Sequence, residues 1–214
     1  MNQKSLFQFN NVESAIAKQR RLTRLVVEES PSLFKPRLLC GLDVAYEEKI
    51  GFAAAAMWDT GTSEIIEVAH AQGRLGVEYV PGLLGFREGP LLLSAVKRLR
   101  NSPDVFLVDG HGRAHPRRFG LACHVGLALD EPTLGVAKSP FYGRTERSRI
   151  VDYDGTRLGR VLRTRSGKLY YVSVGHRVGL DDAFSLVKKC MVNDYPVPLR
   201  TAHLESVRLK RSRG

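Results

Sequence analysis

The chain has 214 residues, of which 43% are hydrophobic and 26% charged, and its 33 Lys and Arg against 22 Asp and Glu give a formal net charge of +11. This length suits one well-cored domain, and no window approaches the ~18 consecutive apolar residues of a membrane-spanning helix. The positive charge favours a polyanionic partner, nucleic acid above all, because Lys and Arg displace counterions from phosphates.

The three cysteines, Cys40, Cys123 and Cys190, have no close spacing. An odd count without a CxxC pair argues against a disulfide framework and against a zinc site, so we expect small core residues in a reducing compartment. The N-terminal segment lacks the long apolar core of a signal peptide. We therefore expect a soluble, cytoplasmic monomer with no membrane association.

The first third of the chain predicts one helix and three strands. Residues 11–29 carry apolar side chains at helical spacing, and Asn11 or Ser14 is the expected cap. Three apolar segments separated by turn-like stretches follow, and they predict an antiparallel meander. Those segments are residues 37–46, 51–58 and 64–72.

The remainder alternates between strands and helices. A Gly/Pro loop from residue 79 leads into an amphipathic helix, expected to begin near Glu88 with Pro90 in its first turn. The other expected elements are strands 105–109 and 132–139, helices 117–130 and 179–191, a hairpin around Ser166-Gly167, and a short final helix after Pro198. This order predicts an α/β fold with a mixed sheet flanked by helices. We expect a single domain over residues 1–214, with a loose basic tail from about residue 208.

Three acidic residues occupy unusual places. Asp43 lies within an apolar strand, Asp109 directly follows the apolar run 105–108, and Glu88 lies where the Gly-rich loop enters a helix. A buried carboxylate needs a partner or a metal, and ligand sites of α/β sheets lie beyond the carboxyl ends of strands. Salt bridges, an outward-facing strand position or a helix first turn would also explain each acid singly. Together the three predict a site for a hard divalent cation.

Five segments, in order, resemble the endonuclease V family. They are "GLDVAY" (41–46), "YVPGLLGFREGP" (79–90), "VDGHGRAHPRRFGLACHVG" (108–126), "LGVAKSPFYG" (134–143) and "PLRTAHLES" (198–206). The resemblance covers residues 37–206. It implies a ribonuclease H-like fold with a mixed five-stranded sheet whose first three strands are antiparallel.

The resemblance also implies an activity. Members of that family hydrolyse the second phosphodiester 3′ to hypoxanthine (deoxyinosine or inosine), leaving 3′-hydroxyl and 5′-phosphate ends, and require Mg²⁺ or Mn²⁺. Carried over by motif, Asp43, Glu88 and Asp109 are the expected metal ligands, and His203 is a fourth active-site residue at a position where some members carry Asp. Lys138 is expected at the scissile phosphate or leaving oxygen, and His115 at the backbone or a bridging water.

The same motifs predict how the substrate is held. Five residues match the family's hypoxanthine pocket, where glycine lets backbone groups approach the flipped base. They are Gly82, Leu84, Gly110, Gly120 and Leu121. Tyr79, Val80 and Pro81 match the wedge that fills the gap left by that base. Glu78 stands where many members have proline, so we expect weaker strand separation or a changed substrate preference.

A cluster of arginines is the expected track for the nucleic-acid backbone. It consists of Arg87, Arg113, Arg117 and Arg118, with further basic residues at 144–149 and 160–168. The sequence predicts a nuclease for deaminated adenine in damaged DNA, acting in repair with Mg²⁺. Three alternatives stay open: an endoribonuclease for inosine in RNA, a binder that has lost its chemistry, and a ribonuclease H or junction-resolving nuclease. The last would share the acids but lack "YVPG" and the glycine pocket.

Overall fold

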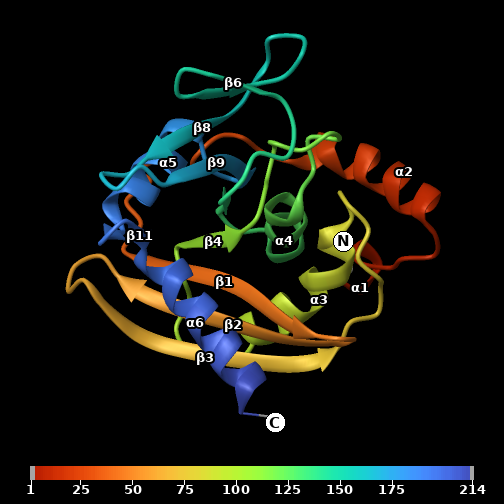
Figure 1. The fold of residues 1–214 in the computed structure, drawn as a ribbon, viewed down its shortest axis with the longest axis horizontal. Coiled ribbons are helices and arrows are strands. Elements are labelled where there is room, and N and C mark those ends of the chain that lie inside the picture. The colour runs from red at the N-terminus through yellow and green to blue at the C-terminus, as the bar shows by residue number, and fades with distance from the viewer. Residues whose placement is uncertain (1–2, 213–214) are drawn as a thin grey trace.

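The computed structural model describes residues 3–212, and a mixed nine-stranded sheet runs through it (Figure 1). The strand order is β3-β2-β1-β4-β5-β9-β8-β7-β6. The strands are β1 (Leu38–Glu47), β2 (Ile50–Asp59), β3 (Glu64–Arg74), β4 (Val105–Asp109), β5 (Thr133–Ala137), β6 (Arg144–Glu146), β7 (Arg149–Val151), β8 (Arg157–Arg163) and β9 (Leu169–His176). Two short strands, β10 (Met191–Val192) and β11 (Tyr195–Pro196), form a separate antiparallel pair.

The predicted meander and mixed sheet are confirmed. Strands β1, β2 and β3 pair antiparallel, whereas β4 pairs parallel with both β1 and β5. These five strands match the sheet that the resemblance implies. The full sheet is wider because β9 pairs antiparallel with β5 and the chain then adds β8, β7 and β6 outward. The hairpin predicted around Ser166-Gly167 is the β8–β9 pair.

Helices cover both faces of the sheet (Figure 1). They are α1 (Gln3–Leu6), α2 (Val12–Leu22), α3 (Leu84–Val96), α4 (Leu121–Leu129), α5 (Leu180–Lys189) and α6 (Val197–Arg211), with a 3₁₀ turn, η1 (Thr23–Leu25), after α2. Alternate residues of β1 separate the two cores, as the two-residue period of a strand requires. Cys40 and Leu42 pack with α3 and α4, while Leu39 packs with α5 and the start of α6.

The three cysteines are buried and unpaired, as expected for core residues. At the N-terminus of α2, Asn11 and Ser14 together form a capping box, in which each side chain accepts from the other's backbone N–H. Within residues 3–212, no helix combines the length and the apolar character needed to cross a membrane.

Several helix boundaries differ from prediction. Helix α3 begins at Leu84 rather than near Glu88, so Pro90 lies inside the helix. The final helix is not short: α6 has 15 residues and continues to Arg211, through much of the expected loose tail. Its buried Leu199, Ala202 and Ser206 hold it against the sheet. Basic residues in its last turn also suit the negative end of the helix dipole. Residues 213–214 of that tail lie outside the described part.

Candidate active site

Two carboxylates meet where the parallel pairing of β1 with β4 ends, in the middle of β1 and at the last residue of β4. Leu42 of β1 pairs with Val108 of β4, so the next residues, Asp43 and Asp109, stand side by side. Both side chains are half-buried. With a ring nitrogen of His203, from α6, their ligand atoms all lie within 4.8 Å of one another. The sequence-predicted Asp43, Asp109 and His203 therefore form one cluster.

Hydrogen bonds fix this cluster. His203 Nδ1 lies 3.0 Å from Asp43 Oδ2, and the Ser206 hydroxyl donates to the same oxygen at 3.0 Å. Lys138 Nζ, just past the end of β5, donates to Asp109 Oδ2 at 2.5 Å. Ser206 was not predicted. Its spacing of three residues from His203 places both on one helix face, and this spacing in "HLES" is the signal that could have identified it.

Glu88 adjoins the cluster but is not part of the 4.8 Å group. It is almost completely buried in α3. Burial, reinforced by the nearby Asp43 carboxylate, raises the pKa of Glu88 to about 8, and Arg87 only partly opposes this. Burial and the charge of Asp43 also raise the pKa of Asp109. Negative charge is thus concentrated beyond what the protein's own cations neutralise.

These residues suit a hard divalent cation. Carboxylate oxygens are the ligands that Mg²⁺ and Mn²⁺ prefer. Burial and, after it, repulsion from Asp43 raise the pKa of Glu88 and Asp109, and a bound cation would favour the charged form of both. Asp43 and Asp109 are placed to hold it directly, and Glu88 is close enough for its charge to act on it.

Glu88→Gln is expected to stabilise the metal-free protein at alkaline pH. The folded-state pKa of Glu88, about 8, exceeds its ordinary value of 4.5. Below pH 4.5 the Glu88 carboxyl is protonated in both the folded and the unfolded state, so its ionisation takes nothing from the free energy of unfolding. As pH rises toward 8, only the unfolded state releases the proton, and stability falls. At pH 8.5 the variant should gain ~2 kcal/mol or more in the free energy of unfolding, and almost nothing at pH 4.5.

The measurement is denaturant unfolding in EDTA across that pH range. Glu64→Gln, at an exposed position of β3, is the matched control and should follow the wild type throughout. Parallel wild-type and Glu88→Gln curves from pH 4.5 to 8.5 would contradict the prediction.

A cavity of about 200 Å³ lies beside the carboxylates, and all five residues of the predicted base pocket line it. Gly82 and Gly120 are needed for the close approach of their neighbours. A Cβ on Gly82, whose φ is +81°, would lie 2.5 Å from Arg117 Nη2, and one on Gly120 would lie 2.3 Å from the His111 carbonyl oxygen. The other lining residues are Tyr79, His111, His115 and the segment 139–141.

His115 lines this cavity, and both nitrogens of its ring are hydrogen-bonded to backbone groups of the protein. Its Nδ1 accepts from the backbone N–H of Arg117 at 3.1 Å, which leaves Nε2–H to donate to the Gly82 carbonyl at 3.0 Å. The neutral ring therefore has both nitrogens occupied by protein groups. Burial accordingly lowers the pKa of His115 to about 3. In the structure His115 braces the Gly82 turn, and its predicted contact with the nucleic-acid backbone or a bridging water stays a prediction.

His111 is a pocket residue that the sequence analysis did not assign. Its Nδ1 is buried and forms no hydrogen bond with any residue in 3–212. Burial lowers the pKa of His111 to about 4, so the ring is neutral near pH 7. An unsatisfied buried nitrogen is costly, and one beside a cavity is available to a bound group. Its position between Gly110 and Gly112 in "DGHG" was the signal.

The predicted wedge is divided between surface and core. Tyr79 is 62% exposed and lines the cavity. Val80 instead packs beside Leu83 and Phe86, which anchors the segment. Pro81 is exposed, and so is Glu78. Tyr79 is the member of the wedge best placed to contact a ligand.

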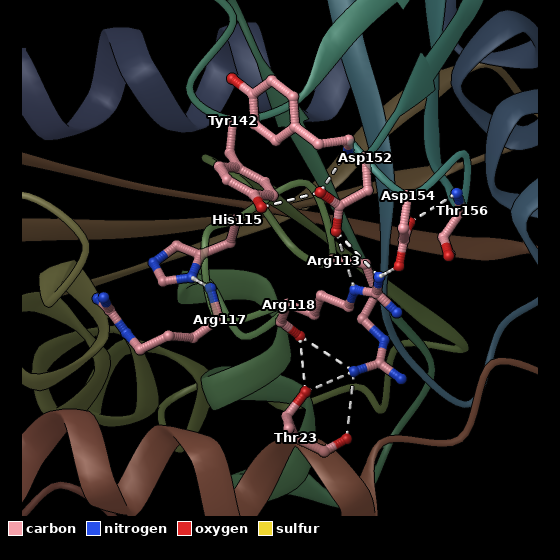
Figure 2. A network of polar contacts seen from close by, with 10 residues as sticks. Thr23, Arg113, His115, Arg117, Arg118, Tyr142, Asp152, Asp154 and Thr156 are labelled. Atoms are coloured by element: carbon pink, nitrogen blue, oxygen red, sulfur yellow. Dashed lines mark hydrogen bonds and ion pairs between the residues drawn. The ribbon is translucent and has the colours of Figure 1, made fainter.

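The four arginines predicted to contact nucleic acid all form hydrogen bonds within the protein, and Figure 2 shows Arg113, Arg117 and Arg118. Arg113 donates to the Thr23 hydroxyl at 2.6 Å and pairs with Glu28, and Arg118 reaches Asp152 and Asp154, both at 2.9 Å.

The other two make similar bonds. Arg117 donates to the Gln19 side chain and to the Gly82 carbonyl, and Arg87 donates to the Val77 carbonyl. The loop after β4 brings Arg113 to Thr23 of η1, and it brings Arg118 to Asp152 and Asp154 between β7 and β8 (Figure 2). These bonds hold the four side chains within the protein, and their contact with the nucleic-acid backbone stays a prediction.

Comparisons with known proteins place these features in context. A family model described as endonuclease V matches residues 20–204. The endonuclease V of Ignicoccus hospitalis is 40% identical over 200 residues, which cover 91% of this chain and 93% of that protein. The crystal structure of the Streptomyces avermitilis endonuclease V is 36% identical, with a TM-score of 0.86 and 96% of each chain covered.

A fourth comparison concerns the fold alone. The Ciona intestinalis endonuclease V, crystallised with a 24mer DNA containing an inosine followed by a ribo-adenosine, matches with a TM-score of 0.86 at 22% identity. The match covers 94% of this chain and 98% of that one.

Proposed function

The chain belongs to the endonuclease V family, and we propose that it is a Mg²⁺-dependent endonuclease for deaminated adenine in DNA. It hydrolyses the second phosphodiester bond 3′ to hypoxanthine, leaves 3′-hydroxyl and 5′-phosphate ends, and acts in DNA repair. One observation carries this proposal. The last residue of β4, Asp109, belongs to the carboxylate cluster, and the next residue, Gly110, lines the wall of the adjacent cavity.

The cavity that would bind the base and the carboxylates that would act on the phosphate are therefore close together, a short distance apart along the bound DNA strand. A flipped base enters the cavity, and the backbone on its 3′ side passes over Asp43 and Asp109. Tyr79, exposed at the cavity, is placed to fill the space that the base leaves. The DNA bound in the Ciona intestinalis structure contains an inosine, which supports the same substrate class here.

Each polar residue of the cluster has a role in hydrolysis. A bound Mg²⁺ would neutralise the phosphate and lower the pKa of water; Asp43 and Asp109 would hold it. Lys138 Nζ, already directed at Asp109, brings a positive charge to the phosphate and its leaving oxygen. Ser206 and His203 orient the Asp43 carboxylate from α6.

The pocket distinguishes hypoxanthine from adenine by hydrogen bonding. Hypoxanthine presents a carbonyl oxygen and N1–H where adenine presents an amino group and an unprotonated N1. Backbone groups at Gly82, Gly110 and Gly120 have no Cβ to block their approach to this edge. The buried, unbonded Nδ1 of His111 adds a side-chain nitrogen at the same cavity.

Cleavage mapping on an end-labelled deoxyinosine duplex tests the proposal. With Mg²⁺ the wild type should cut at the second phosphodiester 3′ to the inosine; the matched deoxyadenosine duplex and an EDTA-treated reaction should stay intact. Inosine-containing RNA of the same sequence is run in parallel and should be the slower substrate. Cutting of RNA alone would assign an endoribonuclease, and equal cutting of the deoxyadenosine control would refute recognition of the deaminated base.

A further inference from the structure

A second cavity, of about 400 Å³, opens on the same carboxylate cluster. It is lined by Asp109, Lys138 and His203 from the cluster and by Tyr170, Tyr195 and Arg200 beyond it. Asp109 and Lys138 line this cavity, whereas their chain neighbours Gly110 and Ser139 line the base pocket. The cluster thus has a cavity on each side, and the proposed function uses only one of them.

The second cavity combines two tyrosine rings with an arginine, Arg200, that forms no ion pair within residues 3–212. Lys168 Nζ lies 3.7 Å from the centroid of the Tyr195 ring, and the Arg200 guanidinium lies 4.3 Å from it. The Tyr170 hydroxyl donates to the Asp194 carbonyl, which fixes that ring. Among residues 3–212, the exposed Arg200 guanidinium has no hydrogen bond and no carboxylate partner. This contrasts with Arg113, whose guanidinium is used within the protein.

We propose that this cavity binds the nucleotide immediately 3′ of the cleaved bond. The inference rests on the proposed function: with the flipped base in the first cavity and the scissile phosphate at Asp43 and Asp109, the strand continues 3′ over the opposite side of the cluster. The residues there suit a nucleotide, because aromatic rings contact bases and sugars of any sequence and an unpaired arginine attracts the phosphate backbone.

The subsite has a defined consequence for the reaction. The nucleotide that it holds keeps the scissile phosphorus as its new 5′-phosphate, while the leaving oxygen becomes the 3′-hydroxyl of the fragment that carries the hypoxanthine. Tyr195 and Arg200 therefore hold the phosphate-bearing strand against the carboxylates. They are binding and positioning residues. Strand β11 leads directly into α6 (Figure 1). Both elements line the cavity, so the helix that carries His203 also carries part of the subsite.

Cleavage by the wild type and by two Tyr195 variants, each measured on two substrates, tests the proposal. Two deoxyinosine strands are compared, one with a normal nucleotide immediately 3′ of the cut and one with an abasic residue there. The wild type should cleave the abasic strand about tenfold more slowly at subsaturating enzyme, the loss expected for one base contact. On the normal strand, Tyr195→Leu should cleave about tenfold more slowly than the wild type. On the abasic strand the two enzymes should cleave at nearly the same rate, and Tyr195→Phe should stay within about twofold of the wild type on both strands.

A binding measurement addresses Arg200 without relying on cleavage. The wild type should bind a 5′-phosphorylated single strand about tenfold more tightly than its 5′-hydroxyl counterpart, and Arg200→Ala should remove most of that preference. Arg100→Ala, an exposed arginine beyond α3, is the matched control and should retain it. Equal losses by Arg200→Ala for both strands would overturn this part of the subsite.

The failures are distinguishable. If the wild type leaves deoxyinosine strands intact, the proposed function fails, and the assignment of the cavity to the nucleotide with the new 5′-phosphate fails with it. If the wild type cleaves at the expected bond but Tyr195→Leu loses rate equally on both strands, the proposed function stands and the subsite is refuted. Slow cleavage by Tyr195→Phe would likewise assign Tyr195 a structural role through its hydroxyl group.

Discussion

Asp43→Ala and Asp109→Ala are each expected to lower the rate of deoxyinosine cleavage by about 10³-fold or more while leaving the protein folded. The loss follows from the position of the two carboxylates, which share one compact group with His203. Removing either leaves too few oxygen ligands to fix a divalent cation at the phosphate, and the electrostatic stabilisation of the transition state goes with it.

Folding should survive because neither acid is fully buried and the Ser206 hydroxyl, which donates to Asp43, also bonds to the His203 carbonyl. Burial and the charge of Asp43 already raise the pKa of Asp109, so ionising Asp109 works against the folded state. Its loss should therefore leave the unfolding temperature of the metal-free protein unchanged or higher. The measurements are single-turnover cleavage in Mg²⁺ and thermal unfolding in EDTA, for each variant beside the wild type.

Asp59→Asn provides the opposite pattern as a control. Asp59 pairs with Arg37 at 2.7 Å and accepts from the Gly61 backbone N–H, at the other end of the β1–β2 pair. Arg37 and Gly61 lower the pKa of Asp59 to about 2. Its replacement should therefore reduce stability but preserve cleavage below the unfolding temperature. Substantial cleavage by Asp43→Ala or Asp109→Ala would contradict the assignment of the catalytic cluster.

The sequence was most informative where one local pattern decided the structure. Alternating and apolar runs bounded by turns predicted β1 to β5, and Asp43 and Asp109 stood out because they interrupt such runs. Strand β6 (Arg144–Glu146) was missed because all three of its residues are exposed and carry no alternation. It is a strand only because β7 pairs with it.

The start of α3 was missed for a different reason. Gly85 and Gly89 lower helix propensity, yet both are required by packing. A Cβ on Gly85 would lie 2.4 Å from His124 Nδ1, and one on Gly89 would lie 2.2 Å from the Phe7 ring. Tertiary contact therefore outweighs local preference here, and no reading of residues 84–89 alone could show that.

The roles of the arginines depended on partners that are distant in the sequence. Arg113 and its acceptor Thr23 are separated by 90 residues, and Arg118 and Asp152 by 34. Charge and motif predict these arginines at the nucleic-acid backbone, and Arg117 lies beside Gly82 at the cavity. Only the fold shows that their guanidinium groups are already hydrogen-bonded, whereas that of Arg200 has no such partner in the described chain.

The backbone of α6 passes so close to Gly41 that no side chain fits there, which explains why "GLD" begins with glycine. A Cβ on Gly41 would lie 2.2 Å from the carbonyl carbon and oxygen of Pro198 and 2.6 Å from Leu199 N. These are backbone atoms at the start of α6, so no rotamer change can relieve the clash. Gly41→Ala must push α6 away from β1.

Gly41→Ala is therefore expected to reduce both stability and cleavage. Gly41 and Asp43 lie on the same face of β1, and α6 holds Asp43 through His203 and Ser206, each at 3.0 Å. Displacing the helix lengthens both contacts, so cleavage should fall by about 10²-fold. The overpacking itself should cost ~1–3 kcal/mol in the free energy of unfolding.

Gly73→Ala is the matched control, because it adds the same methyl group to a strand where space exists. A Cβ there would meet only Leu91 Cδ1, at an ordinary 3.5 Å, so stability and cleavage should stay near wild type. Both variants are measured by denaturant unfolding and single-turnover cleavage at a temperature where each is folded. If Gly41→Ala cleaves at the wild-type rate, the seating of α6 on β1 does not set the geometry of Asp43. If it loses cleavage without losing stability, the strand has absorbed the methyl group and carried Asp43 away from a helix that stayed in place.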